Sequence, residues 1–284
     1  MTSPARWLVV SARPLSPEAA ARLPEQLLAL GGTAVQEDGE VLVTYLPATG
    51  SPGGILEQLR AALPDAELDW RWQENQDWSS EWKRGLGPRK LTERLVVKPT
   101  WTEWEKAPGE VIIDLDPEMA FGTGEHGTTR GCLRLLDAAI RPGDRVLDVG
   151  SGSAILAIAA ARLGAREVVA VEYDADANLN ARDNLERNGV AKCVHIVERL
   201  ADAEVLAALG SFDLVLANIL SGVIRPLLPA FHQALRGASD PRLIVSGILH
   251  AEHSEVVRDA VAAGFRVTGV DTEEEWWSAL LTFA

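Results

Sequence analysis

Residues 144–160, DRVLDVGSGSAILAIAA, decide the fold of the larger part of this chain. The run DRVLDVG predicts a buried strand, and SAILAIAAARLG predicts the helix that follows the glycine turn. A second apolar run, EVVAVE, ends in Glu172, 22 residues after Gly150. A strand, a glycine loop, a helix and a second strand that ends in a carboxylate form the βαβ unit of cofactor-binding domains. We therefore expect a cofactor site at this loop.

An earlier loop, AFGTGEHGTTRG at residues 120–131, has the G-x-G-x-x-G spacing of a dinucleotide fingerprint. Asp116 and Pro117 end the preceding strand several residues too early for that fingerprint. No carboxylate closes a second strand at the expected distance. A bare glycine pattern is weak evidence, so we assign the cofactor to the later loop.

Composition indicates a globular protein of about two domains that does not bind nucleic acid. Of its 284 residues, 47% are hydrophobic and 24% are charged. The formal net charge of −14 opposes a polyanionic substrate, which clustered Lys and Arg would bind. A basic partner fits this charge, and an acidic surface that serves only solubility explains it equally well.

The sequence predicts neither a membrane protein nor a metal site. The N-terminal apolar run is too short for a signal peptide, and no segment approaches the ~18 apolar residues of a membrane span. Cys132 and Cys193 lie far apart and lack metal-ligand spacing. We expect a cytoplasmic monomer.

Residues 1–73 predict a small α+β domain with the order βαββαβ. Predicted strands lie at residues 6–12, 33–37, 40–47 and 66–73, and predicted helices at 17–31 and 53–63. This order is the split ferredoxin-like arrangement. Because these residues carry no catalytic pattern, we expect a substrate-recognition domain.

Six of the nine tryptophans lie between residues 70 and 104. Trp78 and Trp82 are four residues apart, which would place both on one face of a short helix. Packing between domains and stacking on a ligand both explain such residues, and packing is the commoner case. We place a Trp-rich linker at residues 74–94.

Residues 95–284 predict a doubly wound α/β domain, because strands and helices alternate in a way that favours a parallel sheet covered on both faces. The last two strands, joined by DTEE at residues 271–274, would pair as an antiparallel edge. Asn218 lies at the carboxyl end of the fourth strand, counted from the strand that precedes the cofactor loop. Open α/β sheets bind ligands at this edge. The amide oxygen of Asn218 can accept a hydrogen bond from an amine; a helix cap is the alternative role.

The cofactor loop favours S-adenosylmethionine over NAD. A nicotinamide dinucleotide needs a pyrophosphate site with a third glycine, whereas this neighbourhood reads Gly150, Gly152 and Ala154. S-adenosylmethionine has no phosphate, so a shorter G-x-G loop and a carboxylate for the ribose hydroxyls suffice. An NAD-dependent oxidoreductase and a non-catalytic protein that keeps the fold remain alternatives.

Seven segments resemble the bacterial ribosomal protein L-eleven methyltransferases, which use S-adenosylmethionine to methylate a protein of the large ribosomal subunit. They are DWSSEWKRG, ERLVVKPTW, DPEMAFGTGEHGTT, VLDVGSGSAILAIAA, NLERNGV, DLVLANILSG and LIVSGIL, and they span most of the chain. The resemblance implies a class I methyltransferase domain with a seven-stranded, Rossmann-like sheet, preceded by a ferredoxin-like recognition domain. It implies N-terminal and lysine amines of ribosomal protein L-eleven as methyl acceptors.

The resemblance also implies the residues of the cofactor site. Carried over from the family pattern and its neighbourhood, they are Phe121, Gly122, Thr123, Thr129, Asp148, Gly150, Gly152, Glu172 and Asn218. The FGTGEHGTT segment looks like a lid over the cofactor and the methyl-transfer site. Its dinucleotide spacing is then coincidental.

The chain departs from the family pattern at five positions: Glu125 for Thr, Gly127 for Pro, Ser151 for Cys, Ala154 for Gly and Glu172 for Asp. Each is compatible with cofactor binding. Ala154 adds one methyl group and Glu172 reaches one methylene further, so we expect an affinity that differs from that of relatives. Glu125 would add negative charge near a site for a cationic amine, where it either aids substrate capture or is a solvated loop residue.

We expect Asn218 and His126 to take part in catalysis. Asn218 would aim the amine. His126 would remove its proton as a general base, or would only fix the geometry of its loop. An α-amine with a pKa near ~8 is partly neutral already, whereas a lysine near ~10.4 must be desolvated. The expected reaction is in-line attack of a neutral amine without a covalent intermediate.

Overall fold

Two units make up the chain, residues 1–85 and residues 86–284. The computed structural model describes residues 6–29, 35–38, 41–47, 57, 59–74, 86–116 and 124–284. Most of the expected linker, and Trp78 and Trp82 with it, lies outside the described residues. Each unit is described by itself.

The first unit is an antiparallel sheet with helices packed against it. Its strands and helix are β1 (Arg6–Pro14), α1 (Pro17–Ala29), β2 (Val35–Asp38), β3 (Val41–Pro47) and β4 (Ala66–Glu74), with further helical residues at 59–62. The strands lie in the order β2-β3-β1-β4, and every pair is antiparallel. This is the expected ferredoxin-like order. Leu8, Val10, Leu23 and Leu27 are buried between sheet and helix.

The second unit is built on a seven-stranded sheet in the order β10-β9-β8-β11-β12-β14-β13. These strands are β8 (Arg145–Val149), β9 (Glu167–Val171), β10 (Val194–Val197), β11 (Leu214–Asn218), β12 (Arg242–Leu249), β13 (Phe265–Glu273) and β14 (Trp276–Phe283). Pairs from β10 to β12 are parallel, and β14 is antiparallel to both of its neighbours. The chain winds outward from β8 in both directions, so a crevice forms at the carboxyl ends of β8 and β11. The predicted doubly wound, Rossmann-like class I sheet is confirmed.

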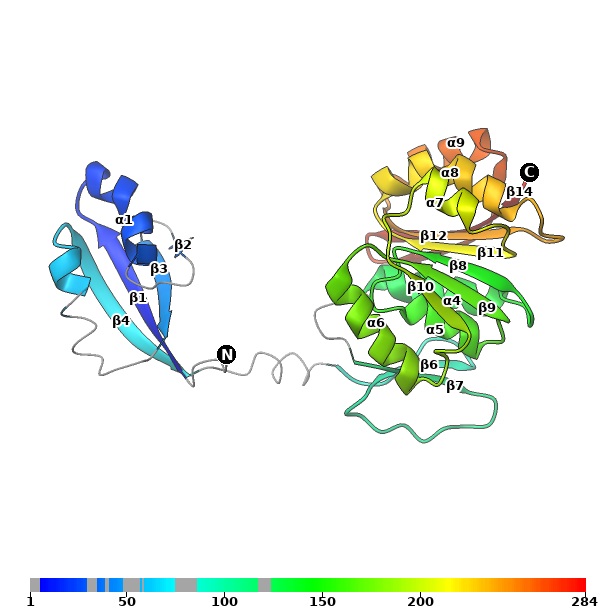
Figure 1. The fold of residues 1–284 in the computed structure, drawn as a ribbon, viewed down its shortest axis with the longest axis horizontal. Helices are drawn as coiled ribbons and strands as arrows, with labels where there is room; N and C mark the ends of the chain where they lie inside the picture. Colours follow the sequence, from blue (N-terminus) through cyan, green and yellow to red (C-terminus); the bar gives the residue numbers. More distant parts are fainter. Residues whose placement is uncertain are drawn as a thin grey trace. The chain divides into compact units, whose positions relative to one another are not determined.

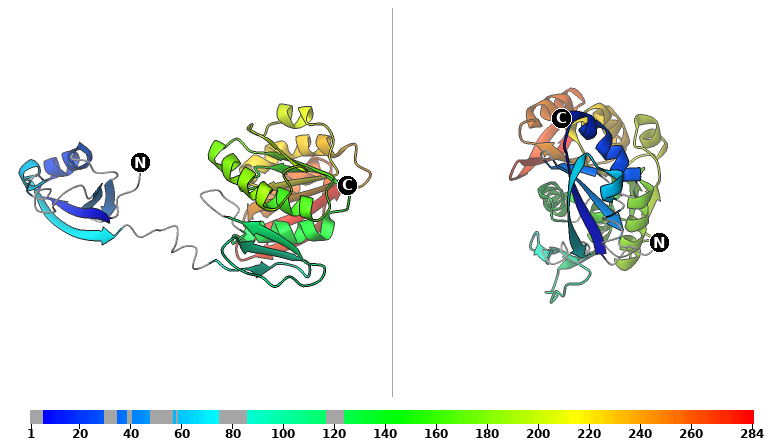
Figure 2. Two further views of the ribbon diagram at one scale, coloured as in Figure 1. Left: turned by 60° about the horizontal axis from the view of Figure 1, so that its bottom comes forward. Right: turned by 90° about the vertical axis from the view of Figure 1, so that its left-hand side faces the viewer.

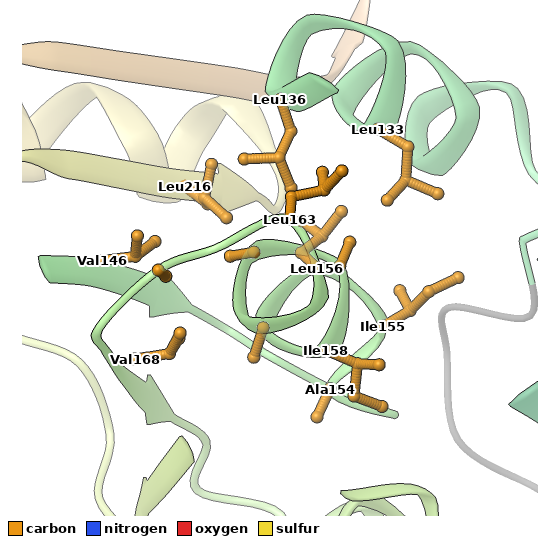
Figure 3. Close-up of a cluster of buried hydrophobic side chains, with 14 of the residues drawn as sticks. Leu133, Leu136, Val146, Ala154, Ile155, Leu156, Ile158, Leu163, Val168 and Leu216 are labelled. Atoms are coloured by element: carbon orange, nitrogen blue, oxygen red, sulfur yellow. The ribbon is translucent and has the colours of Figure 1, made fainter. Parts of the chain in front are cut away.

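Helices cover both faces of this sheet (Figures 1 and 2). They are α4 (Gly127–Ala139), α5 (Ile155–Arg162), α6 (Ala175–Arg187), α7 (Ala203–Ala208), α8 (Ser221–Leu235) and α9 (His253–Ala262). One core cluster joins α4, α5 and α6 to one face (Figure 3), and a second joins α7, α8 and α9 to the other. In β8, Val146 packs into the first cluster and Leu147 into the second. Burial on both faces explains why these strands read as continuous apolar runs.

A three-stranded sheet precedes the helices of the second unit. It contains β5 (Arg89–Lys90), β6 (Leu95–Pro99) and β7 (Val111–Leu115), in that order. β5 pairs antiparallel with β6, and β6 pairs parallel with β7. Arg89 and Lys90 therefore belong to the second unit, although they fall within the range expected for the linker.

Two element boundaries differ from the sequence prediction. The antiparallel edge is present, but β13 continues through Glu273, so the connection lies at Glu274 and Glu275 rather than at DTEE. The helix after the cofactor loop begins at Ile155, because Ala154 adopts a left-handed conformation with φ 63°. Apolar periodicity cannot show either a strand that continues through charged residues or a left-handed residue before a helix.

Candidate functional site

A cavity of about 1140 Å³ opens at the carboxyl ends of β8, β9 and β11. Among the predicted residues, it is lined by His126, Gly150, Gly152, Glu172 and Asn218. These residues come from four separate segments of the chain. The sheet topology thus brings the cofactor loop, the Glu172 carboxylate and Asn218 to one place.

The glycine loop is shaped by its neighbours. Gly150 has φ 69°, and a Cβ atom there would lie 2.4 Å from Ile219 Cγ2. Both the left-handed backbone and the close contact require glycine. The left-handed Ala154 takes up a conformation that costs an L-residue roughly 1–2 kcal/mol, a cost that glycine would avoid.

Glu172 is buried and accepts hydrogen bonds from backbone amides of the glycine loop and of the two residues that follow Glu172. Its Oε2 accepts a hydrogen bond from Gly152 N at 3.0 Å. Its Oε1 accepts from Tyr173 N at 2.9 Å and from Asp174 N at 3.0 Å. A carboxylate has about four lone-pair positions, so about one acceptor position remains, on Oε2, for a ligand hydroxyl. Glu172 therefore also fixes the glycine loop, a role that the sequence did not show.

Asp148 lies beneath the glycine loop, and it does not line the cavity formed by the described residues. Its Oδ2 accepts a hydrogen bond from Ala157 N at 3.0 Å, and its Oδ1 has no partner among the described residues. Burial raises the pKa of this carboxyl to about 7, and the charge of Glu172 adds to the rise. The structure shows that Asp148 holds the start of α5. Its predicted role as a cofactor contact stays a prediction.

Asn218, the last residue of β11, points its amide toward α4. Its Nδ2 donates to Thr129 Oγ1 at 3.3 Å, and its Oδ1 is buried without a partner among the described residues. The capping alternative is not seen, because α8 has Leu220 as its N-cap. Thr129 is itself fully buried and lies behind Asn218 rather than in the cavity wall. The amide oxygen of Asn218 is therefore a hydrogen-bond acceptor beside the cavity without a partner among the described residues.

His126 lies at the start of α4 and lines the same cavity. Its Nδ1 is 2.8 Å from Thr128 Oγ1, and its ring packs 4.8 Å from that of Trp276. Both contacts restrain the ring, as expected of a residue that fixes loop geometry. A general-base role stays a prediction.

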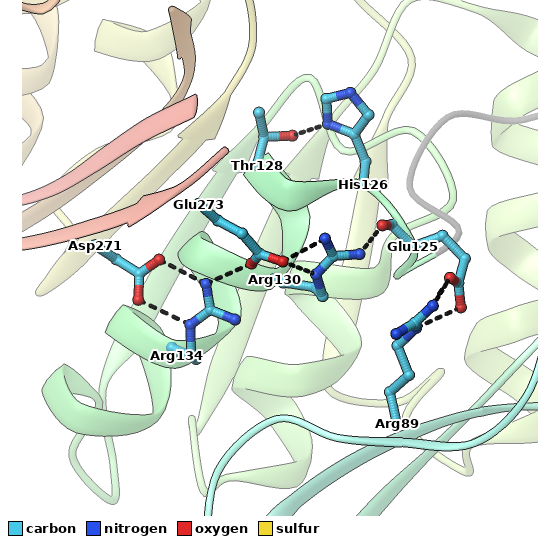
Figure 4. Close-up of polar contacts among 8 residues, drawn as sticks. All are labelled: Arg89, Glu125, His126, Thr128, Arg130, Arg134, Asp271 and Glu273. Carbon is cyan, nitrogen blue, oxygen red and sulfur yellow. Dashed lines mark hydrogen bonds and ion pairs between the residues drawn. The ribbon is translucent and has the colours of Figure 1, made fainter. Parts of the chain in front are cut away.

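A network of charges surrounds the loop that carries His126 (Figure 4). Arg130 donates to Glu273 and to the backbone oxygen of Glu125. Glu125 forms a bidentate ion pair with Arg89. Neither sequence alternative for Glu125 describes this arrangement, because a strand 36 residues earlier supplies the partner. The glutamate anchors the loop to β5 and adds no free charge to the site.

Three predicted cofactor residues, Phe121, Gly122 and Thr123, lie outside the described residues. The lid interpretation depends on them and stays a prediction. Within the described parts of the chain, no group of three or more His, Cys, Asp or Glu side chains is placed to hold a metal ion. In the same residues, no helix has the length and apolar character needed to cross a membrane.

Comparison with known proteins decides the family. The model of the family "Ribosomal protein L11 methyltransferase (PrmA)" matches residues 21–283. The chain belongs to this methyltransferase family. Family membership covers both units, since the match begins in α1 and ends in β14.

Curated members of the methyltransferase family are similar over most of the chain. A ribosomal protein L11 methyltransferase of Pelotomaculum thermopropionicum is 43% identical over 238 residues, which is 82% of this chain and 76% of the relative. One from Exiguobacterium is 40% identical over 242 residues, 82% of this chain and 76% of the relative. A crystal structure of a ribosomal protein L11 methylase from Lactobacillus delbrueckii subsp. bulgaricus superposes with a TM-score of 0.62 at 28% identity. It covers 69% of this chain and 98% of the other chain.

The cavity of this family member fits S-adenosylmethionine by its chemistry. Gly150 has no side chain between the backbone and the cavity, and Glu172 Oε2 has an acceptor position that a ribose hydroxyl could fill. Tyr173 and Leu200 line the cavity with 70% and 64% of their surfaces exposed, which provides apolar area for an adenine ring. Sequence reasoning missed both residues, although Tyr173 directly follows the carboxylate and Leu200 follows the next strand. It also missed Trp276, which was read only as part of the closing strand.

Proposed function

We propose that this chain transfers methyl groups from S-adenosylmethionine to amines of ribosomal protein L11, at its N-terminal α-amine and at lysine ε-amines. Family membership and the printed names of the relatives support the protein substrate. Neither the oxidoreductase nor the non-catalytic alternative is favoured by these relatives. A ribosomal substrate also supports action in the cytoplasm.

The observation that carries the proposal is the orphaned Oδ1 of Asn218. It is a buried acceptor, held by Thr129, beside a cavity that also contains the cofactor loop. A buried acceptor without a partner is costly unless a ligand supplies a donor. A neutral amine has N–H groups to donate and keeps its lone pair for attack. Asn218 would thus orient the amine, and it cannot itself act as a base.

S-adenosylmethionine supplies an electrophilic methyl group on a sulfonium. A new nitrogen–carbon bond forms as the sulfur–carbon bond breaks, and the proton of the amine leaves to solvent or to His126. The chain's own residues contribute proximity, orientation and exclusion of water. We propose that residues 1–73 recognise the protein substrate, because the described part of this unit forms its own sheet and core.

Mass spectrometry tests this function. Purified ribosomal protein L11 is incubated with the enzyme and S-adenosylmethionine, and peptides are mapped for added methyl groups. We expect methylation at the N-terminal amine and at lysines. An Asn218→Ala enzyme serves as the matched control, because it changes the amide and leaves the proposed cofactor loop intact.

A further inference from the structure

The outer edge of β7 is completed by side chains. Among the described strands, β7 pairs with β6 alone. The hydrogen bond from Thr100 N to Leu115 O shows that the backbone N–H and C=O groups of Leu115 point toward β6. Residues alternate along a strand, so the peptide groups of Asp114 and Asp116 face the other way. Buried peptide groups need partners from elsewhere in the chain.

Three asparagines of the α6 region supply these partners. Asn188 Oδ1 accepts from Asp114 N at 2.9 Å, and its Nδ2 donates to Asp114 O at 2.6 Å. Asn184 Oδ1 accepts from Asp116 N at 3.1 Å, and Asn180 Nδ2 donates to Asp116 O at 3.1 Å. All three asparagines are buried. The N–H and C=O groups of both aspartates are therefore satisfied by side-chain amides.

The spacing of the asparagines explains the fit. Four residues of helix rise about 6 Å, and two residues of strand rise about 6.6 Å. Asparagines at 180, 184 and 188 can thus follow the peptide groups at 116 and 114, with the helix running opposite to the strand. The row of amides replaces a missing neighbouring strand. Asn184 and Asn188 belong to the NLERNGV segment, for which the proposed reaction gives no role.

Asn184 also reaches the cofactor loop. Its Nδ2 donates to Ser153 O at 3.3 Å and to Asn180 Oδ1 at 3.1 Å. Arg187 Nη1 donates to Asn184 Oδ1 at 2.7 Å, which fixes the orientation of the amide. One buried amide thus binds the glycine loop through its nitrogen and the end of β7 through its oxygen.

We propose that Asn184 is a positioning residue that sets the glycine loop relative to the end of β7, and so shapes the cavity for S-adenosylmethionine. Asn184 acts through Ser153 and does not line the cavity formed by the described residues. The proposal rests on the proposed function for the identity of the ligand. The hydrogen bonds themselves do not depend on that identity.

Asn184→Asp is the informative variant. It keeps the oxygen that accepts from Asp116 N and Arg187, and it places a carboxylate oxygen opposite Ser153 O. The variant loses the hydrogen bonds that Nδ2 donates to Ser153 O and to Asn180 Oδ1. We expect the dissociation constant for S-adenosylmethionine, measured by calorimetry, to rise about tenfold, the effect of losing the one bond that holds the glycine loop. Leu185→Ala is the matched control, because Leu185 is buried on the same helix and contacts the apolar core. It should lower the Tm and leave the dissociation constant unchanged.

Hydrogen exchange provides a readout that does not need the ligand. Ala154 N donates to Ser151 O at 2.8 Å within the loop that Asn184 holds. Exchange at the Ala154 amide should be faster in Asn184→Asp than in Leu185→Ala at equal loss of Tm. Failure of the wild-type chain to bind S-adenosylmethionine would overturn the proposed function, and the exchange comparison would still test the positioning role. Equal exchange at Ala154 in both variants would show that Asn184 is merely structural. The same conclusion would follow if the wild type binds S-adenosylmethionine and Asn184→Asp binds it with an unchanged dissociation constant.

Discussion

Asn218 and Thr129, 89 residues apart in the chain, share a hydrogen bond of 3.3 Å between Asn218 Nδ2 and Thr129 Oγ1. The amide nitrogen faces α4, and the amide oxygen has no partner among the described residues. In this arrangement the end of the amide left for the proposed amine is the acceptor oxygen. Helix α4 contributes to the site although it precedes the cofactor loop in sequence.

Asn218→Ala should lower kcat more than it raises the dissociation constant for S-adenosylmethionine, because the amide orients the acceptor. The expected fall in kcat is about tenfold to a hundredfold, as for a loss of roughly 1.5–3 kcal/mol. Steady-state kinetics and calorimetry measure the two effects separately. Thr129→Val, which frees the amide to rotate, should reduce kcat in the same direction. Normal turnover with collapsed cofactor affinity would make Asn218 only a cofactor ligand.

Glu172→Gln should weaken S-adenosylmethionine binding by about 1.5–3 kcal/mol, the range for lost hydrogen bonds to a charged acceptor. Glutamine keeps the length of the side chain, but its NH₂ group cannot accept from the backbone amides that Glu172 now binds. Glu172→Asp, which keeps a carboxylate, should bind better than Glu172→Gln. Calorimetry that gives the same affinity for all three proteins would remove this carboxylate from the site.

Stability should depend on pH through Asp148. Burial raises its pKa to about 7, so the folded chain keeps a proton that the unfolded chain releases near pH ~3.9. The bound proton therefore stabilises the folded chain fully below the unfolded pKa of ~3.9. This contribution to the free energy of unfolding is lost as the pH rises from there to about 7. Asp148→Asn removes the titration, so its free energy of unfolding should rise relative to that of the wild type between about pH 5 and about pH 8. Denaturant titrations of both proteins at about pH 5 and about pH 8 measure the two free energies of unfolding. A difference between the proteins that is the same at both pH values would contradict the account.

A fragment of residues 86–284 should fold and bind S-adenosylmethionine, because it is one of the two units of the chain and contains β5 with Arg89. It should lose most of its kcat/KM on ribosomal protein L11, since the first unit is proposed to hold the substrate near the site. A fragment starting at residue 91 is the matched comparison: it lacks the Arg89 ion pair to Glu125 and should be less stable. Equal efficiency of residues 86–284 and the full chain would show that the first unit is not the recognition module.

Sequence patterns predicted the features that depend on local periodicity. Strands buried on both faces read as apolar runs, and the carboxyl-end positions of Glu172 and Asn218 followed from the order of strands and helices. The ferredoxin-like order followed in the same way. The apolar periodicity is readable in the sequence because each helix or strand must bury one or two defined faces.

Features that join distant segments could not be predicted. Arg89 and Glu125 are 36 residues apart, and Asn188 and Asp114 are 74 apart. No local pattern shows that the first pair neutralises a charge near the site or that the second completes a strand edge. The repeat of asparagines at 180, 184 and 188 was visible, but its partner strand was not. Trp276 joined the site only through the pairing of β14 with β12.

Methylation of ribosomal protein L11 itself tests the central claim most directly. Purified L11 is incubated with the full chain and S-adenosylmethionine, and intact-mass and peptide spectra are compared with those from Asn218→Ala. The account predicts mass increases of whole methyl groups on the N-terminal amine and on lysines, fast with the wild type and slow with the variant. Unmodified L11 after incubation with a wild-type enzyme that binds S-adenosylmethionine would contradict it.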